Sequence, residues 1–281
     1  MDAKEHLEEV EAWRADRIAR LRSPGGWLTV VALAWLHDGE NTVGSAEDND
    51  VVIRSRDVPA RLGVLEVSDG GATAMFPPGS GVTHGGKPAT SVPMRDDRQG
   101  HPTVLQIGAV RFHVIWREGR LALRVKDANS PTRSAFTEIR HYPVDLRWRL
   151  ESRFEPYEHE RDVPVMTVLG HEETYRIPGA VAFDVDGRTH RLDAFLEEAD
   201  ATDLFLVFGD ATSGTETYGG GRFLYTPRPV HGRLVLDFNR AYNPPCVFTP
   251  HATCALPLPQ NRLPIRIDAG ERRYEGPIVT A

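Results

Sequence analysis

Polar side chains that could bind a ligand or transfer a proton crowd into one stretch of the sequence, from Asp210 to Glu271. This stretch combines glycines, prolines, acids, arginines, amides and both cysteines of the chain. Polar groups are costly to bury unless each finds a hydrogen-bonding partner, so such a dense group of them needs a physical reason. We therefore interpret the stretch as a binding site.

Three carboxylates in this stretch are candidates for acid–base catalysis: Asp210, Asp237 and Glu271. A carboxyl group can act as a general acid or base when its surroundings bring its pKa toward the working pH. The side chains that we expect to bind or orient the ligand are Thr212, Tyr218, Arg222, Asn239, Arg240, Tyr242 and Asn243. The two arginines present planar guanidinium groups that suit a carboxylate or phosphate, so the ligand is expected to be a polar, anionic small molecule.

The order of these residues along the chain supports this interpretation. Asp210 follows the apolar residues Leu204–Phe208, and strand ends deliver side chains to binding sites. The three glycines Gly219–Gly221 let the backbone approach a ligand closely. Further on, an alternating pattern predicts that Asp237 and Asn239 share one face of a strand.

The sequence lacks the motifs of several common enzyme classes. It has no G-x-S-x-G nucleophile elbow, no phosphate-binding P-loop and no G-x-G-x-x-G after a strand. His171-Glu172-Glu173 begins like a zinc-binding helix, but Tyr175 stands where the second histidine would be, and Gly170 and Pro178 predict a loop. We therefore expect no organic cofactor, and a catalytic function would be hydrolysis or an acid–base reaction.

Cys246 and Cys254 are separated by seven residues, with His251 between them. The three are weak candidates for metal ligands, because they supply at most three ligands and lack zinc-finger spacing. A disulfide is a second interpretation, and a reducing compartment disfavours it. We favour two buried thiols that pack as small hydrophobic groups.

Two alternatives to a small-molecule site remain open. In the first, the protein is a non-catalytic binding module and the late motif is a structural clamp, because ion-pair networks also gather polar residues. In the second, metal-dependent chemistry takes place at the cysteines. A clamp predicts that substitution of Asp237 or Arg222 lowers stability, whereas a ligand site predicts an almost unchanged melting temperature.

Size and composition indicate a mainly β protein with two cores. The chain has 281 residues, which is more than one core usually holds. Its 25 Gly and 21 Pro imply many turns, which favours β structure. Apolar residues spaced three and four apart from Leu7 to Leu21 predict a helix over 3–22. The Ser-Pro-Gly-Gly sequence at 23–26 ends it.

From Trp27 onward, short apolar stretches separated by turn residues predict a β-sandwich, although Trp27–Leu36 fits a strand or a short helix equally well. In the second half, Asp-Gly at 186–187 predicts a hairpin, and Pro264–Asp268 is expected to be the last strand. The predicted domains are an N-terminal helix over 1–24, a β-sandwich over 25–128, a packed linker over 129–150 and a second antiparallel β-barrel or sandwich over 151–281, which carries the candidate site.

The charge distribution argues against several kinds of partner. The chain has 33 Lys and Arg against 40 Asp and Glu, a formal net charge of −7, and lacks the basic patch of nucleic-acid-binding proteins. The N-terminus has no signal-peptide core, and Trp27–Leu36 is too short to span a bilayer. With two cysteines, a cytoplasmic protein that binds neither nucleic acid nor membrane is predicted.

A first group of short motifs is Gly39–Ser45, Asn49–Ile53, Gly85–Lys87 and Ile107–Val114. Their order resembles the strands of a forkhead-associated (FHA) domain, and this resemblance implies a β-sandwich in about a third of the chain. FHA domains bind phosphothreonine through an arginine and a serine–histidine pair. This chain has Ser45 at the arginine position and Pro59 and Leu62 near the other two, so a phosphopeptide partner is not expected.

A second group of motifs runs through nearly the whole chain: Pro24–Leu28, Gly39–Gly44, Tyr142-Pro143, Asp210–Ser213, Thr217-Tyr218, Gly221–Leu224, Asp237–Cys246, Cys254, Pro257, Asn261–Leu263 and Ala269–Glu271. Together they resemble the bacterial and archaeal family called domain of unknown function 1684. This resemblance implies no mechanism. His251 and Ala255 depart from the family pattern, where an aromatic residue and a proline are common, and this weakens a metal role for His251.

Overall fold

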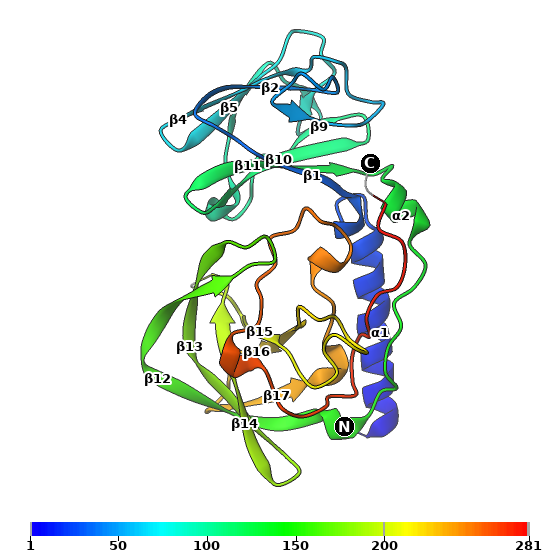
Figure 1. Cartoon of the computed structure of the whole chain (residues 1–281), viewed down its shortest axis with the longest axis vertical. Helices are drawn as coiled ribbons and strands as arrows, with labels where there is room; N and C mark the ends of the chain where they lie inside the picture. The colour runs from blue at the N-terminus through cyan, green and yellow to red at the C-terminus, as the bar shows by residue number, and fades with distance from the viewer. Residues whose placement is uncertain (1, 199, 280–281) are drawn as a thin grey trace. The chain divides into compact units, whose positions relative to one another are not determined.

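Antiparallel strands make up most of the protein in the computed structural model, which describes residues 2–198 and 200–279 (Figure 1). A single long helix, α1, begins the described chain. This confirms the predicted fold class, mainly β with an N-terminal helix. None of the helices within the described residues is long and apolar enough to cross a membrane.

The chain forms two compact units that interleave along the sequence. The first, called here the barrel unit, consists of Met1–Ala19, Thr137–Val247 and Thr253–Gly276. The second, called the sandwich unit, consists of Arg20–Phe136, Phe248–Ala252 and Pro277–Ala281. The predicted domains, in contrast, follow one another along the chain, and their residues 1, 199, 280 and 281 lie outside the described part.

Helix α1 spans Ala3–Arg22, so the predicted helix over 3–22 is confirmed. Its buried side is partly polar: Leu7 is 44% exposed, whereas the neighbouring His6 is fully buried. Gly26 follows the helix closely, and a β-carbon at this position would overlap the last carbonyl groups of the helix. The glycine therefore lets the chain turn directly against the helix end.

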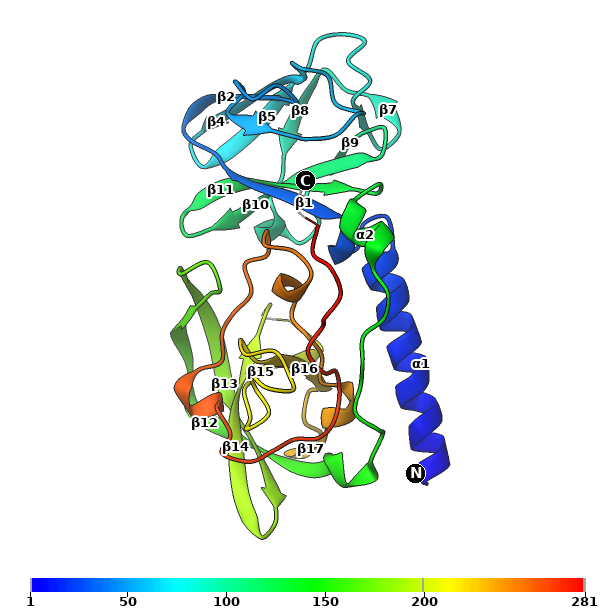
Figure 2. The same cartoon turned by 45° about the vertical axis from the view of Figure 1, so that its right-hand side comes forward.

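The sandwich unit contains the strands β1 (Val30–Trp35), β2 (Gly39–Gly44), β3 (Val51–Val52), β4 (Gly63–Ser68), β5 (Gly71–Met75), β6 (Thr83–His84), β7 (Lys87–Pro88), β8 (Ser91–Met94), β9 (Leu105–Ile107), β10 (Val110–Arg117) and β11 (Arg120–Asp127), and the short helix α2 (Pro131–Ala135). One sheet has the order β1-β11-β10-β9-β6-β7 and the other β3-β2-β4-β5-β8 (Figure 2). The ambiguous stretch Trp27–Leu36 becomes a 3₁₀ turn, Trp27–Thr29, followed by β1.

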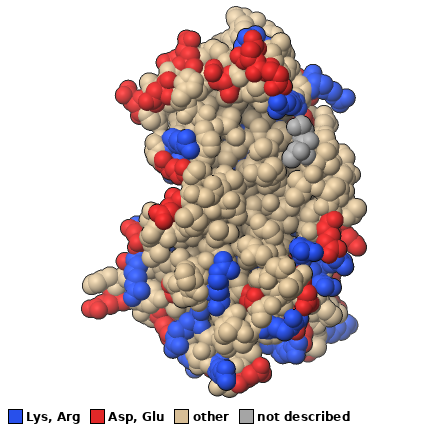
Figure 3. Space-filling model, in the orientation of Figure 1, with Lys and Arg blue, Asp and Glu red and all other residues tan. Residues whose placement is uncertain are grey.

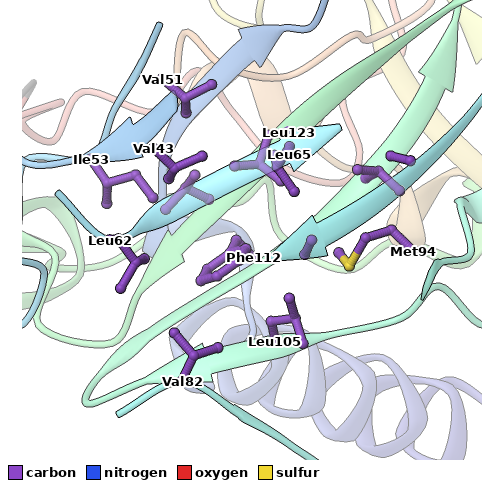
Figure 4. Close-up of a cluster of buried hydrophobic side chains, with 14 of the residues drawn as sticks. Val43, Val51, Ile53, Leu62, Leu65, Val82, Met94, Leu105, Phe112 and Leu123 are labelled. Atoms are coloured by element: carbon purple, nitrogen blue, oxygen red, sulfur yellow. The ribbon is translucent and has the colours of Figure 1, made fainter. Parts of the chain in front are cut away.

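The hydrophobic core of the sandwich unit draws side chains from both of its sheets. Val43 and Leu65 come from one sheet, and Phe112 and Leu123 come from the other; all four are at most 1% exposed. Figure 4 shows these side chains gathered between the strands. Alternate residues along β10 are buried, as expected for a strand with one face toward a core.

The barrel unit contains the strands β12 (Arg149–Met166), β13 (Glu172–Val185), β14 (Arg188–Leu196), β15 (Asp203–Phe208), β16 (Arg222–Pro227) and β17 (Arg233–Asp237). They form one sheet in the order β16-β15-β14-β13-β12-β17. The hydroxyl of Thr226 on β16 donates to the carbonyl oxygen of Val235 on β17 at 2.9 Å, so the two edges meet and the sheet nearly closes into a barrel.

The turn between β13 and β14 confirms the predicted hairpin. Asp186 and Gly187 have positive φ angles of 49° and 73°, which a tight hairpin turn requires. Two other predictions are wrong. Glu172 and Glu173 begin β13 instead of forming a loop, because the chain turns just before them and pairs with β12. The segment Pro264–Asp268 is irregular: its backbone bonds to the side chains of Asp210 and Arg222 and to the backbone of Ala211, which lies in the loop after β15.

Acidic and basic side chains are interspersed on the face drawn in Figure 3. Some of the exposed residues form ion pairs, such as Arg191 with Glu155 at 2.8 Å and Arg153 with Asp184 at 3.4 Å. Exposed pairs contribute little to stability. The charged side chains that matter most for this fold are therefore the buried ones.

His113 should make the sandwich unit sensitive to acid. Burial, and then the neighbouring charges of Arg124 and Lys126, lower the pKa of His113 from 6.5 to about 4. Because the unfolded chain binds this proton more readily, stability is present above pH 6.5 and falls as the pH drops toward 4. His113→Gln cannot take up the proton, and it should retain on the order of 2 kcal/mol more of its pH 7 stability at pH 4.5.

Urea unfolding of the wild type and His113→Gln at pH 7 and pH 4.5 would measure this difference. The quantity compared is the loss of unfolding free energy between the two pH values in each protein. Equal losses would show that His113 stays accessible to protons in the folded state.

Candidate functional site

The predicted catalytic and ligand-binding residues all belong to the barrel unit, but the structure divides the acids, arginines and amides among three clusters. They lie on the segments drawn in yellow, orange and red in Figure 1. One cluster is built on Asp210 and Arg222, the second on Asp237 and Asn239, and the third on Glu271. Each cluster is described by its own contacts, because these decide what its polar groups can do.

The side chain of Asp210 is fully buried. Its carboxylate accepts hydrogen bonds from the Thr212 hydroxyl at 2.7 Å and from the backbone N–H of Ile267 at 2.7 Å. The hydroxyl of Thr212 lies 2.9 Å from that of Thr217, which closes the loop that follows β15. Protein groups therefore satisfy this carboxylate, as in a structural anchor.

Arg222 is 1% exposed and lies beside Asp210, with an Nη2–Oδ2 distance of 3.2 Å. Its guanidinium also donates to the carbonyl oxygens of Ala269 and of Ile267, the latter at 3.1 Å. Burial lowers the pKa of Arg222, and the charge of Asp210 opposes this shift. The side chain ties β16 to the irregular segment 265–269 and has no exposed face for an anionic ligand.

Of the glycines at 219–221, Gly221 has the clearest conformational requirement. Its φ angle is +89°, and a β-carbon there would lie 2.6 Å from the carbonyl oxygen of Phe208 and overlap Pro257. The glycine thus permits close packing of one protein segment on another just before Arg222. We expected close approach to a ligand at this position, and the protein itself fills the space.

The strand alternation predicted through Asp237 and Asn239 is wrong. Strand β17 ends at Asp237, and the 3₁₀ helix η4 (Phe238–Arg240) follows. The Asp237 carboxylate caps this turn by accepting from the backbone N–H of Asn239 at 3.0 Å and from its Nδ2 at 2.9 Å. Asn239 also bonds the N–H and the carbonyl oxygen of Asp145, each at 3.0 Å. Local capping therefore competes successfully with strand extension here.

The N-terminal helix completes this second cluster. His6 of α1 is fully buried, and its Nε2 lies 3.6 Å from the Asp237 carboxylate and 3.3 Å from Nδ2 of Asn239. Arg240, whose side chain is 35% exposed, donates to Glu9 of α1 at 3.0 Å. The predicted residues Asp237, Asn239 and Arg240 thus hold α1 against the turn after β17.

Glu271 is 1% exposed and receives two hydrogen bonds from Arg17 of α1, the second at 3.2 Å. It also accepts from the backbone N–H of Asn243 at 2.7 Å. Arg17 reaches the carbonyl oxygen of Asn243 at 2.9 Å, and the Asn243 side chain donates to the carbonyl oxygen of Arg272 at 2.8 Å. The third predicted acid therefore joins α1 to two later segments of the same unit.

The predicted residue Tyr242 lies in a partly exposed group whose other members were not predicted. This aromatic face consists of Trp13, Tyr225 and Tyr242, with the carboxyl group of Glu197 beside them. Tyr225 is 41% exposed, and its ring stacks 4.9 Å from that of Phe205 and 6.3 Å from that of Tyr242. The ring of Trp13 lies 6.2 Å from that of Tyr242.

Glu197 supplies the acid of the aromatic face. The hydroxyl of Tyr225 donates to its carboxyl group at 2.7 Å. Part of Glu197 is exposed, but protein atoms displace water around the carboxyl group and raise the pKa of Glu197, while the hydrogen bond from Tyr225 opposes this shift. The alternation of Phe223 and Tyr225 with Leu224 is the sequence signal that could have located this face.

Tyr218 lies beside the two cysteines, which are thiols and not halves of a disulfide. The backbone N–H of Cys246 donates to Sγ of Cys254 at 3.3 Å, and Sγ of Cys246 lies 3.6 Å from the hydroxyl of Tyr218. His251, the third weak metal candidate, belongs to the sandwich unit. Across residues 2–198 and 200–279, no group of three or more His, Cys, Asp and Glu side chains is arranged to hold a metal ion.

Fold and contacts together describe a two-unit β protein whose most distinctive polar motif is largely buried. The family model described as "Protein of unknown function (DUF1684)" matches residues 134–272. The chain belongs to this family, which confirms the resemblance seen in the sequence. No curated protein matches the chain.

Several solved structures are similar to the chain. An uncharacterised protein of Haloarcula marismortui, solved by NMR, is 32% identical over 50% of this chain and 78% of that chain, with a TM-score of 0.43. The FHA domain of FhaA, complexed with the intracellular domain of another protein, is 16% identical over 32% of this chain and 84% of that chain, with a TM-score of 0.24. EmbR of Mycobacterium tuberculosis, in complex with a low-affinity phosphopeptide, is 15% identical over 45% of this chain and 32% of that chain, with a TM-score of 0.23.

The contacts of Asp210 predict a large loss of stability when its charge is removed. Asp210→Asn leaves the buried guanidinium of Arg222 without its counter-charge, which should lower the unfolding free energy by about 3–5 kcal/mol. Urea unfolding at pH 7 measures this loss. The double variant Asp210→Asn/Arg222→Met should be more stable than Asp210→Asn, because it no longer buries an unpaired charge.

Asp184→Asn is the matched control, because Asp184 pairs with Arg153 at a site where both side chains are more than half exposed. This substitution should cost less than about 1 kcal/mol. An Asp210→Asn protein as stable as Asp184→Asn would instead support a ligand-binding role for Asp210.

Proposed function

We propose that the barrel unit binds a polar, ring-shaped small molecule at the aromatic face. The observation that carries this proposal is the pairing of a 41% exposed tyrosine, Tyr225, with a carboxyl group of raised pKa, Glu197, at a distance of 2.7 Å. Perturbed titratable groups that remain accessible are typical of functional sites. This proposal keeps the predicted small-molecule ligand and moves its site away from the buried clusters.

The aromatic face offers two kinds of contact to such a ligand. Tyrosine rings provide a large apolar surface that loses little conformational entropy on binding, together with a hydroxyl group for hydrogen bonding. A Glu197 carboxyl that keeps its proton to a higher pH can donate a hydrogen bond or a proton to a ligand oxygen. Acid–base chemistry therefore belongs to Glu197 in this proposal, in place of Asp210, Asp237 and Glu271.

The charges beside the face favour a neutral ligand over the anion that the arginines had indicated. The guanidinium of Arg17 lies 4.2 Å from the centre of the Tyr242 ring. It already donates to Glu271 and to the carbonyl oxygen of Asn243. Arg222 is equally committed to protein groups, so its charge is not offered to a ligand.

The buried clusters support the structural-clamp interpretation for the residues that form them. The carboxylates of Asp210 and Glu271 each accept several hydrogen bonds from protein groups. A structural clamp formed by these residues is compatible with ligand binding elsewhere in the barrel unit. We also keep the predicted cytoplasmic location as part of the proposal, because two cysteines in 281 residues fit a reducing compartment.

Tyr225→Ala should weaken ligand binding because it removes the exposed ring of the face. Saturation-transfer NMR of the wild type against neutral monosaccharides and nucleosides would identify a ring compound that binds. Loss of one stacked aromatic contact should weaken its affinity by about tenfold. Met166→Ala, which removes an apolar side chain 44% exposed on β12, should leave the affinity unchanged.

Tyr225→Phe separates stacking from hydrogen bonding, because it keeps the ring and removes the donor to Glu197. It should retain most of the affinity. If neither compound class binds the wild type, or if Tyr225→Ala binds as tightly as Met166→Ala, the aromatic face is not the ligand site.

Glu197→Gln should raise the melting temperature at neutral pH. The folded-state pKa of Glu197 is raised above its ordinary value of 4.5, so its contribution to stability is present below pH 4.5 and is lost as the pH rises through the folded-state value. Glutamine stays neutral at every pH. The melting temperature at pH 7 should therefore rise, by only about 1–2 °C because solvent screens this partly exposed group.

Differential scanning calorimetry at pH 7 and pH 4 measures the effect, and the difference between the two proteins should vanish at pH 4. A variant that melts lower than the wild type at pH 7 would mean that the Glu197 carboxylate is stabilised in the fold.

A further inference from the structure

The two cysteines and Tyr218 form a cluster that neither the clamp nor the aromatic face uses. Cys246 lies in the 3₁₀ turn Pro245–Val247 and is partly exposed, whereas Cys254 is 7% exposed. The backbone N–H of Cys246 points at Sγ of Cys254, 3.3 Å away. The two thiols are therefore neighbours, although they are eight positions apart in the sequence.

Backbone contacts within the barrel unit hold both thiols in place. The carbonyl oxygen of Cys254 accepts from the N–H of Val168 at 2.9 Å, and the next residue, Ala255, forms a bridge with Thr167 just after β12. On the other side, the N–H of Val247 donates to the carbonyl oxygen of Pro244 at 3.1 Å, which closes the turn around Cys246. The side chain of Cys246 also lies within hydrogen-bonding reach of Cys254. Two thiols this close are suited to reversible bond formation.

We propose that Cys246 and Cys254 form a reversible dithiol–disulfide couple, with Cys246 as the attacking thiol and Cys254 as the resolving thiol. Cys246 takes the first role because it is the more exposed of the two. The oxidant is a low-molecular-weight disulfide. Free thiols, as in this structure, are the reduced state of the couple.

Thiol–disulfide exchange oxidises the pair in two steps. The Cys246 thiol loses its proton to water, and the thiolate attacks one sulfur of the small disulfide; a mixed disulfide forms and the first small thiolate leaves. Cys254 then loses its proton, and its thiolate attacks the Cys246 sulfur and releases the second small thiolate. The two released thiolates take up the two protons. The protein dithiol is oxidised to a disulfide, and the small disulfide is reduced to two thiols.

Tyr218 is the positioning residue for the first step. Its hydroxyl lies 3.6 Å from Sγ of Cys246 and can donate a hydrogen bond to the thiolate. Burial, together with the neighbouring cysteine, raises the pKa of Tyr218, so this donor keeps its proton. Hydrogen bonding from Cys254, and then from Tyr218, lowers the pKa of the Cys246 thiol against the opposing effect of burial. A larger thiolate fraction makes attack on a disulfide faster at neutral pH.

Treatment of the reduced full-length protein with glutathione disulfide at pH 7, followed by intact-mass spectrometry, tests the couple. The wild type should lose two hydrogen atoms in mass and become resistant to iodoacetamide at both cysteines, with only a transient glutathione adduct. Cys254→Ser should stop at a stable adduct of one glutathione on Cys246. Cys246→Ser should react at least tenfold more slowly than Cys254→Ser, because Cys254 is buried.

Tyr218→Phe tests the positioning role with a readout that packing alone does not move. The rate of adduct formation in the Cys254→Ser background should fall by about threefold to tenfold at pH 7, and its pH profile should shift to higher pH. Tyr157→Phe is the matched control, because the hydroxyl of Tyr157 bonds to Asp193 and not to a thiol. It should leave both the rate and the pH profile unchanged.

Three results would overturn the proposal. The wild type could keep a stable glutathione adduct, which would show that Cys254 does not resolve it. The two single-cysteine variants could react at equal rates, which would remove the assigned roles. Finally, both cysteines of the wild type could remain reduced and unmodified, which would leave two packed thiols, the interpretation favoured from the sequence.

Discussion

The buried ion pair between Asp210 and Arg222 is the constraint on which the late part of the chain depends. Removing two charges from water is costly, and the pair is tolerated only because nearly every remaining donor and acceptor is matched. The backbone of Ile267 and Ala269 supplies those matches, so the segment that carries it must run irregularly past β16. Gly221 must in turn be a glycine, because the chain enters Arg222 through a crowded turn.

The same principle explains the attachment of the N-terminal helix. Its His6 and Arg17 are bonded to Asn239 and to Glu271, residues more than 230 positions away in the chain. A helix held by polar contacts need not show a clean apolar stripe, and the exposure of Leu7 beside the buried His6 is the visible result. Asp237, Asn239 and Glu271, three of the predicted site residues, therefore fasten α1 to later segments of the barrel unit.

This explains which features could be predicted and which could not. The helix over 3–22 and the hairpin at Asp186-Gly187 are local, and periodicity or turn chemistry is enough to locate them. The turn after Asp237 was not predicted, because strand alternation does not show that the Asp237 side chain caps the backbone of Asn239. The Asn239 side chain in turn bonds to Asp145, which is distant in the sequence. Residue type alone marked Arg222 as a contact for an anionic ligand. Its partners are instead the buried Asp210 carboxylate and two carbonyl groups more than 40 positions away.

Accessibility, and not the density of polar residues, distinguishes the two proposed sites from the buried clusters. Glu197 lies outside the crowded stretch, and the pairing of β15 with β16 and the return of the chain after β14 bring it to Tyr225, which lies within the stretch. Cys246 lies inside that stretch, yet it keeps partial exposure and a neighbouring thiol. Both groups retain an atom that can exchange a proton or an electron pair with another molecule. The Asp210 carboxylate has none, because protein donors already occupy it.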